Sequence, residues 1–181
     1  METSKSPRYY FDFRKERKAA AKGESAFTPA TSLFAALGAA LDFIRQMENG
    51  DLVAGRNALI DNAELAAEMT RAGAKALGLE LFAPTCPGAA LTAIQAPDGV
   101  DSSAMVKQFR EQFGAVVANG QAEMKGKLFR IAHLGYYDYL DTIGILAALE
   151  IVMAGLGLAV DYGAAVRAAQ EVYAKTAVAR N

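Results

Sequence analysis

The segment 128–133 most constrains the fold, because its sequence predicts a short buried strand with one arginine at the centre. The alternation of a strand places Phe129, Ile131 and His133 on one face. Arg130 lies on the other face, between apolar neighbours. Burying a guanidinium there costs free energy unless an anion binds it. Its planar pair of N–H donors suits a carboxylate. Spacing favours a structural ion pair with an internal Asp or Glu, and leaves a carboxylate-binding site as the alternative.

The composition describes a chain that can bury one core. It has 181 residues, of which 52% are hydrophobic and 22% charged, with a net charge of −1. No basic excess points to nucleic acid. The apolar run 142–160 is interrupted by Glu150 and two glycines, which favours a buried helix over a membrane span. Cys86 is the single cysteine, so no internal disulfide forms, and a free thiol indicates a reducing compartment. We expect a cytoplasmic protein that binds neither nucleic acid nor membrane.

Hydrophobic periodicity and turn residues predict an α/β fold. Thr31 or Ser32 is expected to cap the first long helix, and residues 1–26 differ from the rest in their aromatic and charged runs. The predicted elements, in order, are helices at 33–47 and 52–77, strands at 79–83 and 91–96, a helix at 102–113, strands at 115–118 and 128–133, and helices at 138–156 and 161–176. This order predicts a small, mostly antiparallel sheet covered by helices on one side and preceded by two long connecting helices.

Other polar residues carry weaker signals. Thr28 lies just before a helix start, where a phosphate could bind, but the residues alone favour ordinary capping. His133 is the only histidine, so a histidine-rich metal site cannot form, and a core histidine is expected. Asp138 and Asp141 suit the start of a helix. We therefore predict neither metal chemistry nor hydrolysis.

Three segments resemble one enzyme family, over about residues 8–157. They are the Phe-Thr-Pro segment 27–33, the stretch from Arg56 to the strand at 92–93, and Asn-Gly-Gln at 119–121 followed by the arginine strand within 125–135. Together they are similar to the C-terminal part of class V pyridoxal-phosphate-dependent aminotransferases. The similarity is strongest to the alanine–glyoxylate and serine–glyoxylate group, whose relatives include soluble hydrogenase subunits.

The resemblance implies roles for two residues. Arg130 matches the arginine that binds the α-carboxylate of the substrate, and Thr28 matches a threonine that reaches the cofactor phosphate of the neighbouring subunit. It also implies a homodimer, pyridoxal 5'-phosphate as cofactor, and small amino-acid and 2-oxo-acid substrates. The chain departs from the family at Asn119 and Ala132, where glycine is common.

The resemblance further implies the small domain of a fold-type I aminotransferase. Residues 1–30 would be the tail of an otherwise absent large domain, 31–78 the connecting helices and 79–181 the C-terminal small domain. No lysine matches the Schiff-base lysine of the family, so no catalytic residue is assigned and the chain alone is expected to be inactive. The alternative is a stand-alone small domain that acts as a non-catalytic binding or interaction module.

Overall fold

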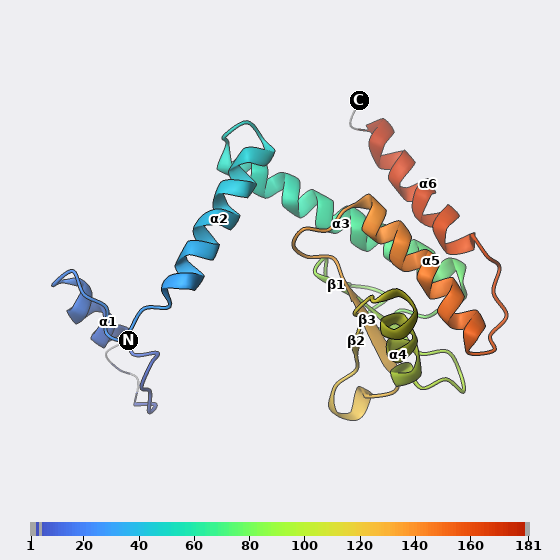
Figure 1. Ribbon diagram of the computed structural model, residues 1–181, viewed down its shortest axis with the longest axis horizontal. Helices are drawn as coiled ribbons and strands as arrows, with labels where there is room; N and C mark the ends of the chain where they lie inside the picture. Colours follow the sequence, from blue (N-terminus) through green and yellow to red (C-terminus); the bar gives the residue numbers. More distant parts are fainter. Residues whose placement is uncertain (1–2, 4, 180–181) are drawn as a thin grey trace. The chain divides into compact units, whose positions relative to one another are not determined.

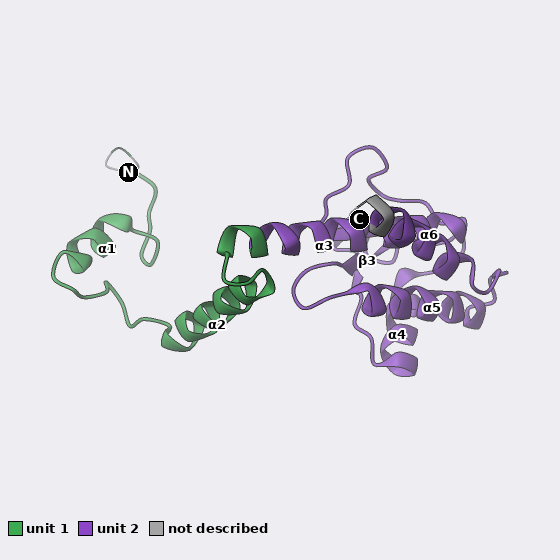
Figure 2. Cartoon of the chain, turned by 90° about the horizontal axis from the view of Figure 1, so that it is seen from above, with its two compact units in different colours: residues 1–55 green, residues 56–181 purple. Residues whose placement is uncertain are grey.

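A computed structural model describes residue 3 and residues 5–179. The chain divides into two compact units, Met1–Gly55 and Arg56–Asn181 (Figure 2). Helix α3 (Leu52–Ala76) begins in the first unit and continues in the second. Among the described residues, no helix has the length and apolar character that crossing a bilayer requires.

The first unit is built from helices α1 (Phe13–Ala20) and α2 (Thr31–Met47). The side chain of Asp12 caps α1, and its hydrogen bonds with Arg14 lower the pKa of that carboxyl to about 2. Helix α2 confirms the predicted first long helix, but its N-cap is Ala30, so the expected cap at Thr31 or Ser32 was wrong. The apolar side chains of α2 are exposed, namely Leu33, Phe34, Leu37, Leu41, Phe43 and Met47. An amphipathic helix of this kind normally buries such a face against other protein.

The second unit contains a three-stranded antiparallel sheet in the order β1-β3-β2. The strands are β1 (Leu91–Gln95), β2 (Ala118–Asn119) and β3 (Leu128–Ala132). The strand predicted at 79–83 is reduced to one bridge, between Leu81 and Ile94, and the prediction there was wrong. Pairing stops because a turn with two prolines follows, and proline has no N–H to donate.

The helices of the second unit confirm the predicted pattern: α4 (Ser102–Phe113), α5 (Tyr139–Gly155) and α6 (Ala164–Ala179), with the 3-10 turn η1 (Ala122–Met124) between β2 and β3. Asp138 and Asp141 form a capping box at the start of α5, as helix-start acids should. Buried Glu150 accepts the backbone N–H groups of Gly163 (2.7 Å) and Ala165 (2.9 Å), which ties α5 to the start of α6.

The core lies between the helices and one face of the sheet. Helix α4 contacts β2 and β3, and α5 contacts α4 and α6 (Figure 1). Phe129 and Ile131 join the helices in one buried cluster. Leu128, which alternation places on the opposite face, is buried outside that cluster. The structure confirms an α/β fold with a small antiparallel sheet and helices on one face, and Arg130 lies on the face away from the core.

Candidate functional site

Arg130 occupies the middle of the central strand of the sheet. Its directly paired neighbours are Ala93 on β1 and Ala118 on β2. Directly paired residues share a face of the sheet, as does Ala132 two positions along β3. The half-buried guanidinium therefore shares its face of the sheet with the methyl groups of three alanines.

The guanidinium binds a backbone carbonyl instead of an acid. Arg130 Nε donates to the carbonyl oxygen of Asn119 at 3.1 Å, and Nη2 donates to the same oxygen at 2.7 Å. The ion pairs found within residues 3 and 5–179 join Arg14 with Asp12, Lys107 with Glu111 and Arg167 with Asp161. None involves Arg130, so the internal ion pair favoured by spacing is wrong for the described part of the chain.

This arrangement uses one edge of the guanidinium and leaves another open. The Nε–Nη2 edge is occupied by the Asn119 carbonyl. The edge formed by Nη1 and the second N–H of Nη2 has no hydrogen-bond partner in the described structure and can present two parallel donors. A carboxylate is the group that such a pair of donors matches best.

The loop between β2 and β3 is tightly built around Asn119 and Gly120. A Cβ atom on Gly120 would overlap the carbonyl oxygen of Met124, so glycine is required there. The Asn119 side chain binds the first turn of α4 through Ser102 and Ser103. From the sequence, Asn119 was noted only because glycine is common there in the family. Its hydrogen bonds to the serines of α4 were not predicted. The signal available was an asparagine directly before a glycine, in the turn that precedes the arginine strand.

His133 is a buried, neutral histidine at the end of the same strand, with 1% of its surface exposed. Its Nε2 is hydrogen-bonded to Thr92 Oγ1 at 2.8 Å, and Nδ1 has no hydrogen-bond partner among the residues that the structure describes. Burial, and to a lesser degree the charge of Arg71, lowers the pKa of His133 to about 4. Within the described residues, no group of three or more His, Cys, Asp or Glu side chains could hold a metal ion. His133 therefore fits the core histidine that the sequence predicted.

Thr28 lies in the first unit, in the segment that leads into α2. The segment is held by Glu16, which accepts the N–H of Ala26 (3.1 Å), and by Ser25, which donates to the carbonyl of Phe27 (2.6 Å). Thr28 is exposed, no side chain caps the N-terminus of α2, and its first turn carries no acid. A hydroxyl beside an uncapped helix N-terminus is a suitable environment for a phosphate group.

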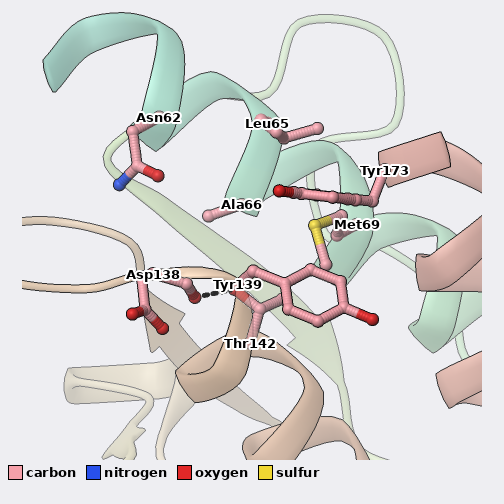
Figure 3. Close-up of a pocket in the computed structure, with 8 residues that line it drawn as sticks. All are labelled: Asn62, Leu65, Ala66, Met69, Asp138, Tyr139, Thr142 and Tyr173. Carbon is pink, nitrogen blue, oxygen red and sulfur yellow. Dashed lines mark hydrogen bonds between the residues drawn. The ribbon is translucent and has the colours of Figure 1, made fainter. Parts of the chain in front are cut away.

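A hollow of about 290 Å³ lies elsewhere in the second unit, between α3, α5 and α6 (Figure 3). Three of its polar residues have structural partners. Asn62 donates to the carbonyl of Tyr137 (2.6 Å), Thr142 donates to the carbonyl of Asp138 (2.9 Å), and the Asp138 carboxylate caps α5. The rings of Tyr139 and Tyr173 pack against each other with centroids 4.4 Å apart. The contacts of these residues therefore serve the packing of α3, α5 and α6.

No protein-family model matches the chain. The chain is 37% identical to the soluble hydrogenase small subunit of Synechococcus sp. over 86% of its own length and 38% of that protein. It is 32% identical to the L-aspartate–glyoxylate aminotransferase of Paracoccus denitrificans, over 99% of the chain and 44% of that enzyme. The solved structure of pyridoxamine–pyruvate aminotransferase from Mesorhizobium loti matches with a TM-score of 0.76 and 32% identity, covering 83% of this chain and 38% of that one. The chain thus spans about two fifths of the length of the relatives it matches.

Proposed function

Because the chain is homologous to class V aminotransferases over most of its length, we propose that it is the C-terminal segment of such an enzyme. The enzyme would move an amino group between a small amino acid of the alanine or serine type and a 2-oxo acid of the glyoxylate or pyruvate type. In this proposal residues 1–30 belong to a large domain, 31–78 form the connecting helices and 79–181 form the small domain. We place the enzyme in the cytoplasm, where a free cysteine stays reduced.

The observation that carries the proposal is the open edge of the Arg130 guanidinium. The cation is half-buried among alanines, is held by a carbonyl oxygen and has no acidic partner among the described residues. Such a cation is stabilised when an anion from outside binds it. Amino acids and 2-oxo acids share a carboxylate next to the reacting carbon. One arginine can therefore hold both the donor and the acceptor in the same orientation.

The surroundings of Thr28 favour pyridoxal 5'-phosphate as the cofactor. Its exposed hydroxyl and the uncapped start of α2 fit a phosphate, and we propose that they receive the phosphate bound to the other subunit of a homodimer. When bound, the cofactor supplies the carbonyl group and the electron sink that amino-group transfer needs. Arg130 contributes binding and orientation of the substrate.

We propose that the chain does not transaminate alone, because none of its lysines lies in a segment like that of the Schiff-base lysine. The exposed apolar side chains of α2 favour a segment that packs against further protein over a stand-alone binding module. A hydrogenase role based on iron–sulfur chemistry would need several cysteines, and the sequence contains one.

The proposal is tested by titrating the chain with pyruvate and following the Arg130 Nε–H signal by NMR. Pyruvamide, which lacks the carboxylate, is the matched control ligand, and the Arg130→Met variant identifies the signal. We expect pyruvate to shift the signal in a saturable manner and pyruvamide to leave it unchanged. Equal responses to the two ligands, or no response to pyruvate, would overturn the assignment of Arg130.

A further inference from the structure

Asn119 connects the two faces of the sheet at the point where Arg130 is held. It pairs with Phe129, so its side chain lies on the helix side of the sheet. Its carbonyl oxygen accepts both hydrogen bonds from Arg130, whose side chain lies on the opposite face. A single residue thus contacts helix α4 with its side chain and the candidate carboxylate site with its backbone.

The Asn119 amide uses both of its ends in hydrogen bonds. Its Oδ1 accepts from Ser102 Oγ at 2.6 Å and from its neighbour Gly120 N at 2.8 Å, with a longer contact from Gly126 N at 3.3 Å. Its Nδ2 donates to Ser103 Oγ at 2.8 Å. These bonds attach the end of β2 both to the first turn of α4 and to the loop that leads into β3, so the peptide that carries the Asn119 carbonyl has little freedom to rotate.

We propose that Asn119 is the positioning residue for Arg130. By fixing its own carbonyl, it holds the Nε–Nη2 edge of the guanidinium and turns the Nη1–Nη2 edge toward the substrate. The carboxylate is then bound end-on, by one N–H from each terminal nitrogen. This inference rests on the proposed function, because it assigns the way in which the same site presents its donors.

The expected magnitude follows from the ordering of one long side chain. An arginine that is not held beforehand must lose its rotamer freedom when the ligand binds. We therefore expect loss of the Asn119 side chain to weaken carboxylate binding by roughly three- to tenfold. The fold should remain, because glycine at this position leaves the backbone carbonyl in place.

The test compares the full chain with the Asn119→Gly and Ser103→Ala variants. Ser103→Ala removes the acceptor of the Asn119 Nδ2 bond together with the side-chain hydrogen bond between Ser103 and Asp101, and it remains informative if Asn119→Gly does not fold. Glu150→Gln is the matched control, because it perturbs a buried hydrogen-bond network at the α5–α6 junction instead. Two quantities are measured: the solvent exchange rate of the Arg130 Nε–H without ligand, and the Kd for pyruvate from the NMR titration.

We expect faster Nε–H exchange and a larger Kd in Asn119→Gly, a smaller effect of the same sign in Ser103→Ala, and values like those of the wild type in Glu150→Gln. Unchanged exchange and Kd in the folded Asn119 and Ser103 variants would overturn the positioning role, even if the wild type binds pyruvate. If the wild type does not bind pyruvate, the proposed function fails. The exchange rates then still decide whether Asn119 holds Arg130.

Discussion

Replacing Arg130 by methionine should have a small effect on the stability of the chain, and the structure gives the reason. The substitution keeps the apolar stem and removes the charge together with two hydrogen bonds to one carbonyl oxygen. A net hydrogen bond contributes about 0.5–1.5 kcal/mol, and removing an unpaired, half-buried cation offsets part of that loss. We expect the free energy of unfolding to fall by about 1 kcal/mol.

A structural ion pair would behave differently, because removing one partner leaves a buried charge and costs about 3–5 kcal/mol. The assay is urea unfolding followed by circular dichroism for the wild type and Arg130→Met. Phe129→Ala is the positive control, since Phe129 is fully buried in the core beside Arg130 and its truncation should cost about 3–5 kcal/mol. A loss of 3 kcal/mol or more in Arg130→Met would refute the view that this arginine is kept for a ligand.

Three further changes test the structure around the site. Gly120→Ala should lower the free energy of unfolding by about 3 kcal/mol, because the added Cβ overlaps backbone, whereas Gly88→Ala meets nothing within 4 Å and should be nearly neutral in the same urea experiment. Glu150→Gln should cost about 2–4 kcal/mol, because an amide cannot accept both N–H bonds, while exposed Glu171→Gln should change stability by less than about 0.5 kcal/mol. His133 should titrate near pH 4 in the fold instead of 6.5, so stability should fall as the pH drops from 6.5 through 4; an NMR titration of this single histidine with a midpoint near 6.5 would contradict its burial.

Local signals explain why most helices were predicted well. The acids at the start of α5 and the glycine after α4 have cap geometries that depend on near neighbours in sequence. The strand carrying Arg130 was predicted because a short, mostly apolar run surrounds the arginine. The run at 79–83 was overestimated, since an apolar composition does not reveal that pairing with β1 is limited to the bridge at Leu81 and the backbone hydrogen bonds of Glu80 and Phe82 beside it.

The partner of Arg130 could not be predicted from the pattern of residues. It is a backbone carbonyl, which every residue possesses, and the carbonyl is brought near only when β2 pairs with β3. The bonds between Asn119 and the serines of α4 likewise join positions 16 and 17 residues apart. Such contacts arise from tertiary packing, so a single sequence supplies the candidate arginine and leaves its environment open.

The most direct test of the central claim is cofactor trapping on the purified chain. The protein is mixed with pyridoxal 5'-phosphate, reduced with borohydride and digested, and the modified lysines are identified by mass spectrometry. We expect no lysine to carry a stoichiometric pyridoxyl group and no amino-group transfer from alanine or serine to glyoxylate. One fully modified lysine together with turnover would show that the chain holds its own catalytic residue and would contradict the account.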